Sequence, residues 1–110
     1  MTTVHASAVQ SGTTGILIRG PSASGKSRLA FDLILAGRAG KIPATILICD
    51  DRVLLETNAG HLIAKAPDTI GGLIEIRGLG IRRCDFIPQG TIGLLIDLHA
   101  EDAARMPEAK

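Results

Sequence analysis

The segment from Gly20 to Ser27 reads Gly-Pro-Ser-Ala-Ser-Gly-Lys-Ser and matches the pattern G-x-x-x-x-G-K-S/T at every specified position. In this pattern the glycines let backbone N–H groups curve around phosphate oxygens, and the start of a following helix adds a partial positive charge. Lys26 would lie over the β- and γ-phosphates, and Ser27 would offer its hydroxyl to Mg²⁺. The alternative to a phosphate-binding loop is an ordinary strand-to-helix turn of small residues in which Lys26 is only solvated. The segment therefore predicts binding of a nucleoside triphosphate and leaves the acceptor open.

Phosphoryl transfer also needs carboxylates, which commonly follow buried strands. Asp50 and Asp51 follow the apolar run 44–49, and Asp97 follows the run 91–96. Successive side chains of an extended backbone point to opposite sides, so we expect only one of Asp50 and Asp51 to face the nucleotide directly. A solvated turn is the alternative for this pair. For Asp97, a residue that serves a turn is the favoured interpretation.

Two further polar residues have ordinary structural interpretations when they are taken alone. Glu75 lies within the apolar run 73–76, where it would share a face with Arg77 and form an ion pair. His5 is a lone histidine ahead of the small residues 6–8, and such a histidine is most often structural.

The elements that must position these residues follow from the apolar pattern. Residues 14–19 form a strand candidate directly before the phosphate-type segment, and from Lys26 the apolar residues recur at helical spacing, with Gly37 and Gly40 as stop signals. Residues 44–49 form a buried-strand candidate. The predicted order of strand, loop and helix is the context that the phosphate interpretation requires.

The rest of the chain predicts further strands. Runs 53–56 and 61–66 flank a turn at 57–60, which indicates an antiparallel hairpin. Residues 67–72 indicate a turn or short helix, 73–76 and 91–97 are strand candidates, and 101–110 form a polar, Ala-rich tail. One helix against several strands, some of them in hairpins, favours the α/β class with a mixed sheet.

Composition bounds the function classes. The 110 residues carry 12 basic and 11 acidic side chains, a net charge of +1, and 45% are hydrophobic, which fits one folded domain covering 1–110. With two Phe, no Trp and no Tyr, and no basic stripe, we expect no nucleic-acid partner. There is no apolar run of membrane-spanning length and no leader pattern, so we expect no membrane partner and a cytoplasmic location. Cys49 and Cys84 lack metal-type spacing and predict two reduced, buried thiols.

Four stretches together resemble the C-terminal catalytic domain of the HPr kinase/phosphorylase family. They are Val4–Ser7, Gly20–Ser27, Asp50–Val53 and Ile74–Ile81, of which the last, Ile-Glu-Ile-Arg-Gly-Leu-Gly-Ile, is the most specific. The intervals from His5 to Lys26 and from Asp51 to Glu75 also agree with the family. The resemblance implies a fold similar to the nucleotide-binding core of phosphoenolpyruvate carboxykinase, with a mixed sheet around the P-loop and its helix.

The resemblance implies a role for each matching residue. Lys26 would contact the transferred phosphoryl group, Ser27 and Glu75 would hold Mg²⁺, and Asp51 would accept the proton of the substrate serine and return it in the reverse direction. His5 would lie near the reacting groups and Asp50 would orient them. The nucleotide-binding residues would be Gly20, Pro21, Ser22, Ala23, Ser24, Gly25, Lys26 and Ser27.

The implied activity is ATP- and Mg²⁺-dependent phosphorylation of a serine on the phosphocarrier HPr or a paralogue, reversed by inorganic phosphate with release of pyrophosphate. Long family members imply a homo-oligomer, and the residues leave the oligomeric state open. Pro21 and Ala23 stand where members commonly carry Asp and Gly, and the family's downstream arginine and substrate-contacting segment would lie beyond Lys110. The alternatives are a nucleotide-binding regulatory module without transfer chemistry and an unrelated small-molecule kinase.

Overall fold

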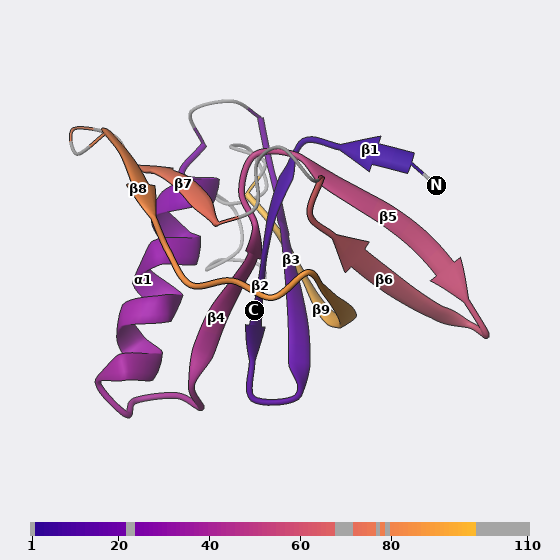
Figure 1. Ribbon diagram of the computed structural model, residues 1–110, viewed down its shortest axis with the longest axis horizontal. Helices are drawn as coiled ribbons and strands as arrows, with labels where there is room; N and C mark the ends of the chain where they lie inside the picture. Colours follow the sequence, from indigo (N-terminus) through magenta and orange to yellow (C-terminus); the bar gives the residue numbers. More distant parts are fainter. Residues whose placement is uncertain (1, 22–23, 68–71, 77, 79, 99–110) are drawn as a thin grey trace, which may run out of the picture.

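A seven-stranded sheet forms the body of the computed structural model, which describes residues 2–21, 24–67, 72–76, 78 and 80–98. The strand order is β1-β5-β6-β9-β3-β2-β4, and β7 and β8 form a separate ribbon (Figure 1). β3 and β9 run parallel, whereas the other paired strands are antiparallel. The elements are β1 (Thr2–Val4), β2 (Ala6–Ser11), β3 (Thr14–Arg19), α1 (Lys26–Arg38), β4 (Thr45–Cys49), β5 (Val53–Asn58), β6 (His61–Lys65), β7 (Leu73–Ile76), β8 (Gly80–Arg83) and β9 (Gln89–Asp97). The predicted mixed α/β class is confirmed.

The start of α1 depends on a glycine. Gly25, at the N-cap, has a φ of 98°, a left-handed conformation that glycine adopts without the steric cost of a Cβ. No side chain caps this end, and the first turn holds no acidic residue. Neither Gly25 nor the first turn therefore supplies a side-chain acceptor for the first N–H groups of the helix, which carry the positive end of the helix dipole.

The other end of α1 corrects one of the two predicted stop signals. Gly40 follows the helix with a φ of 78°, as expected for a glycine after a C-terminus, and its N–H donates to the carbonyl of Gly37. Gly37 itself lies inside the helix. A Cβ at Gly37 would come within 2.7 Å of the Thr45 backbone nitrogen, so glycine is needed there for close approach of α1 and β4.

Alternate residues of the central strands pack into two apolar clusters. In β3, Ile16 and Ile18 contact the cluster that contains Ala30 and Ile34 of α1, whereas Leu17 belongs to a second cluster. The second cluster also holds residues of β2, β4, β5 and β6. Because a strand points successive side chains to opposite faces, both faces of the sheet centre are buried. Figure 1 shows α1 beside β4, with the β7–β8 ribbon next to it.

The predicted hairpin is present with a tighter turn. β5 and β6 pair from Leu54–Lys65 to Asn58–His61, so the loop is only Ala59 and Gly60. Both loop residues have positive φ values, 55° and 83°, which is the requirement of a two-residue turn between twisted strands.

Three strands lie outside the elements that we predict from the sequence. β1 is short, and β2 consists largely of Ala and Ser. β8 begins at Gly80, a residue that we interpret from the sequence as a break between strands. β2 is buried because it lies between β3 and β4, a non-local condition. The predicted turn or short helix at 67–72 falls largely, and the tail at 101–110 wholly, outside the described residues.

Candidate active site

The carboxylate of Asp50 is the centre of a buried hydrogen-bond network. Asp50 directly follows β4 and is only 4% exposed. Its Oδ1 accepts from the Ser7 hydroxyl at 2.6 Å, and its two oxygens accept from the Ser27 hydroxyl at 2.7 and 2.8 Å. The backbone N–H of Glu75 donates to Oδ2 at 3.1 Å. Three donors therefore stabilise a carboxylate that water scarcely reaches.

Four elements bring these groups together. β2 lies between β3 and β4 in the sheet, which puts Ser7 beside the end of β4. Ser27 lies in the first turn of α1, and α1 follows β3 after the glycine-containing loop. β7 packs against α1 and supplies the N–H of Glu75. The site is thus assembled from parts of the chain that are far apart in sequence.

Lys26 is held by its own loop. Its ammonium donates to the carbonyl oxygens of Gly20 at 2.9 Å and Pro21 at 3.1 Å, and the residue is only 6% exposed. A lysine ammonium has three protons and no acceptor, so it takes whatever oxygens lie within reach. An anionic ligand in the loop would offer stronger partners than these neutral carbonyls.

The described part of the loop is closely packed. The Ser24 hydroxyl is buried without a hydrogen-bond partner among the described atoms, and the Ser24 N–H donates to the carbonyl of Pro21 at 3.1 Å. A Cβ at Gly20 would lie 2.5 Å from that hydroxyl oxygen, so a larger residue here would require the Ser24 side chain to shift. Ser22 and Ala23 fall outside the described residues.

Asp51 has a different environment from that of Asp50. It is exposed and has a φ of 73°, unusual for a residue with a side chain. Its N–H approaches the Ser7 hydroxyl oxygen at 3.5 Å, and its carbonyl accepts from Ala6 at 3.3 Å, next to the exposed His5. The pair therefore separates into an inner carboxylate that contacts Ser27 and an outer residue that is exposed at the surface.

The remaining predicted residues lie around this network. Glu75 contributes its backbone to Asp50 while the residue itself is exposed. Asp97 ends β9 in register with Arg19 of β3. Ser7 is a functional candidate that the sequence did not reveal, since its neighbours Ala6 and Ala8 are buried, small and apolar, and nothing in the local pattern separates it from them.

Both cysteines are free, as expected from the sequence, but only Cys49 is buried, so the expectation of a buried thiol is wrong for Cys84. Burial raises the pKa of the Cys49 thiol to about 11. Cys49 donates to the backbone carbonyl of Arg52 at 2.6 Å and so supports the turn that follows Asp50. Burial also raises the pKa of Cys84, which is partly exposed. Both thiols are therefore protonated at neutral pH.

The Asp50 network fits Mg²⁺ by its donor chemistry. Among the described residues, no three His, Cys, Asp or Glu side chains gather into a metal cluster. Mg²⁺, however, prefers oxygen ligands and commonly takes one or two from the protein, with water and substrate phosphates for the rest. The hydroxyl of Ser27 at the start of α1 is an oxygen of this kind, and the Asp50 carboxylate, within hydrogen-bond distance of it, adds the negative charge that favours a cation there.

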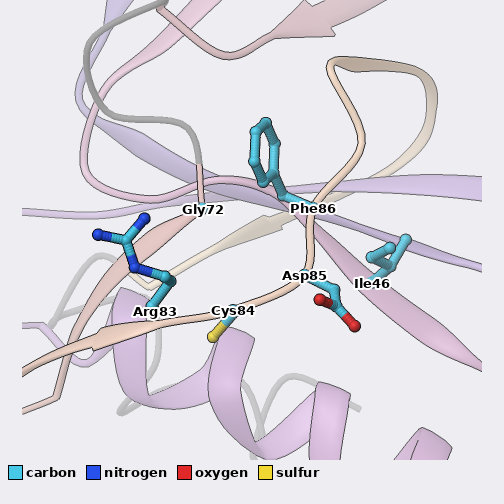
Figure 2. Close-up of a pocket in the computed structure, with 6 residues that line it drawn as sticks. All are labelled: Ile46, Gly72, Arg83, Cys84, Asp85 and Phe86. Carbon is cyan, nitrogen blue, oxygen red and sulfur yellow. The ribbon is translucent and has the colours of Figure 1, made fainter.

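A pocket of about 650 Å³ lies outside this network, lined by Ile46, Gly72, Arg83, Cys84, Asp85 and Phe86, and burial together with the Asp50 charge raises the pKa of Cys84 in its lining (Figure 2). Ile46 precedes Asp50 by four positions of an extended chain, which is roughly 13 Å. Figure 2 shows the Cys84 sulfur pointing toward α1. None of the predicted site residues that the structure describes lines this pocket.

Fold and site together define an α/β domain in which a glycine-containing loop, a helix start and a carboxylate at a strand end converge. The family described as HPr Serine kinase C-terminal domain matches residues 1–87, and the chain belongs to this family. The HPr kinase/phosphorylase of Geobacillus thermodenitrificans is 36% identical over 109 residues, covering 92% of this chain and 33% of that protein. The HPr kinase/phosphorylase of Mycoplasma mycoides is 38% identical over 77 residues, covering 70% of this chain and 22% of that protein.

A solved structure agrees with these relatives. The HPr(Ser) kinase/phosphatase from Coxiella burnetii superposes with a TM-score of 0.74 at 30% identity, over 88% of this chain and 59% of that chain. The chain thus spans about a fifth to a third of the two relatives named above. Within the residues that the structure describes, no helix is long and apolar enough to cross a bilayer.

Proposed function

We propose that this chain is the phosphoryl-transfer domain of a protein-serine kinase/phosphorylase. Its reaction would be ATP- and Mg²⁺-dependent phosphorylation of a serine on HPr or a related phosphocarrier protein. In the reverse direction inorganic phosphate would attack the phosphoserine and pyrophosphate would leave. The observation that carries the proposal is the contact between Ser27 and Asp50, which unites the loop–helix segment with a strand-end carboxylate in a chain of this family.

The nucleotide would bind as it does in a P-loop, within a core similar to that of phosphoenolpyruvate carboxykinase. The triphosphate would lie along Gly20–Ser27, where the uncapped N–H groups of α1 and the flexible backbone of Gly25 favour an anion. Lys26 would release the carbonyls of Gly20 and Pro21 and donate to the β- and γ-phosphates instead. Among the described residues, the buried Ser24 hydroxyl has no hydrogen-bond partner to lose in this exchange.

Ser27 and Glu75 would hold Mg²⁺, and Asp50 would hold Ser27. Bound Mg²⁺ would neutralise charge that develops on the phosphate oxygens. Asp50 accepts the hydrogen bond that the Ser27 hydroxyl donates, so the lone pairs of that hydroxyl are free to face the loop. The Glu75 N–H on Asp50 keeps β7 beside the site.

Proton transfer would belong to the outer acidic residue. The exposed Asp51 carboxylate would accept the hydroxyl proton of the substrate serine as its oxygen attacks the γ-phosphorus, and would return that proton to the serine oxygen during phosphorolysis. His5, also exposed and adjacent through the Ala6–Asp51 hydrogen bond, would lie near the reacting groups. The outer position of Asp51 suits a protein substrate, since the acceptor serine must be brought to it from solvent.

Phosphoserine formation on HPr tests this proposal. We expect the chain, incubated with ATP, Mg²⁺ and HPr, to yield phosphoserine detectable by mass spectrometry, and to release pyrophosphate from phosphorylated HPr and inorganic phosphate. Glu75→Gln should lose both reactions, while Asp32→Asn, an exposed change on α1, should keep both. ATP binding without transfer would contradict the enzymatic proposal and favour the regulatory alternative.

A further inference from the structure

Ser7 is a buried polar residue without a role in the proposed reaction. Three polar or charged residues are buried in the described part of the chain, namely Ser7, Lys26 and Asp50. All three lie at the same site, and Ser7 is completely inaccessible to solvent on β2, between β3 and the outermost strand β4. Burying a hydroxyl is unfavourable unless it is hydrogen-bonded, so the position of this one calls for a reason.

The Ser7 hydroxyl contacts both consecutive aspartates. It donates its proton to Oδ1 of Asp50 at 2.6 Å, and its oxygen faces the backbone N–H of Asp51 at 3.5 Å. Asp51 has the left-handed backbone that turns the chain away from β4. One side chain on β2 therefore touches the carboxylate of the inner acid and the backbone of the outer one.

We propose that Ser7 is a positioning residue for the magnesium–nucleotide site, acting through Asp50 on Ser27. This inference rests on the proposed function. A hydroxyl has one proton and two lone pairs, so fixing where the proton points also fixes where the lone pairs point. Ser7 and the Glu75 N–H donate to different oxygens of the Asp50 carboxylate, and the carboxylate thus fixed accepts a hydrogen bond from the Ser27 hydroxyl. The lone pairs of Ser27 are thereby directed into the loop.

The test measures the affinity for the ATP analogue AMP-PNP in excess Mg²⁺ and in EDTA. The affinity in Mg²⁺ divided by the affinity in EDTA gives the Mg²⁺ ratio. We expect Ser7→Ala to lower this ratio about tenfold while the affinity in EDTA stays within about twofold of wild type. Ser7→Thr, which keeps the hydroxyl, should recover the ratio. Val9→Ala is the matched control, because Val9 is equally buried on β2 and has no polar contact. It should lower the melting temperature and leave the ratio unchanged.

A double substitution locates the effect. In a Ser27→Ala background, Ser7→Ala should cause no further fall in the ratio, because the group on which it acts is gone. An unchanged ratio in Ser7→Ala, or an equal fall of the ratio in Val9→Ala, would overturn the inference about Ser7. If the wild-type ratio is large in that case, the proposed function still stands. A wild-type ratio of about one would overturn both. Should Ser7→Ala not fold, Ser7→Cys, with its weaker donor, takes its place with the same expected direction.

Discussion

Replacing Asp50 separates its role as a hydrogen-bond acceptor from its role as a charge. In Asp50→Ala, the fully buried Ser7 hydroxyl and the Glu75 N–H both lose their acceptor, whereas the half-buried Ser27 can turn elsewhere. Each unsatisfied group costs about 1–3 kcal/mol, and removal of a desolvated carboxylate offsets part of this. We expect a net loss of about 3 kcal/mol in the free energy of unfolding.

Asp50→Asn keeps one acceptor oxygen and adds two protons. Turned so that its oxygen meets the Glu75 N–H, the amide can donate to the oxygens of Ser7 and Ser27, and only the Ser7 proton loses its acceptor. The expected loss is about 1 kcal/mol, and in a domain of this size each kcal/mol lowers the melting temperature by about 4–8 °C. Both variants should nevertheless lose the Mg²⁺-dependent part of nucleotide affinity, since neither has the negative charge.

Thermal unfolding and nucleotide titration, applied to both variants, check these two expectations. Asp32→Asn is the control, because Asp32 is an exposed partner of Arg28 on α1 and such pairs contribute less than about 1 kcal/mol. Equal destabilisation by Asn and Ala would refute the acceptor argument. Wild-type Mg²⁺-dependent affinity in Asp50→Asn would refute the argument from charge.

Three further substitutions test other parts of the account. Lys26→Ala should lower nucleotide affinity at least about tenfold in calorimetric titration, since it removes the loop cation, and unchanged affinity would contradict that role. Asp51→Asn should keep nucleotide binding and lose serine phosphorylation, because an amide cannot accept the proton, and equal loss of binding would speak against Asp51 as the base. Gly72→Ala should lower the melting temperature more than Gly60→Ala. Both glycines have a φ of 83°, but only at Gly72 would a Cβ meet the Phe86 ring, at 2.8 Å, so equal shifts would show that packing there is unimportant.

Local patterns predicted those parts of the fold that depend on neighbouring residues. The strand 14–19, the helix start at Lys26 and the strand 73–76 have the predicted bounds, because apolar periodicity and a glycine-containing loop are readable within a few residues. The hairpin around Gly60 follows from turn chemistry in the same way. β2 was missed because its Ala and Ser residues have low strand propensity and its burial comes from β3 and β4 on either side.

The candidate site shows the same division. The sequence identifies the loop 20–27 and the acidic residues at the strand ends as candidate site residues. It does not show which groups hydrogen-bond to each carboxylate. Ser7 lies 43 positions from Asp50 and Ser27 lies 23 positions from it, and their contacts depend on the order of strands in the sheet. Which aspartate faces inward was likewise undetermined, because the left-handed backbone at Asp51 has no local sequence signal.

The central claim is that the segment 20–27 binds the phosphates of a nucleotide with Asp50 and Glu75 beside it. A titration of the ¹⁵N-labelled chain with AMP-PNP and Mg²⁺, followed by amide chemical shifts, tests it most directly. The account predicts saturable shifts concentrated at residues 20–27, 50–51 and 75, with little change at the Arg83–Phe86 pocket. Shifts centred on that pocket, or no saturable shifts along the loop, would contradict it.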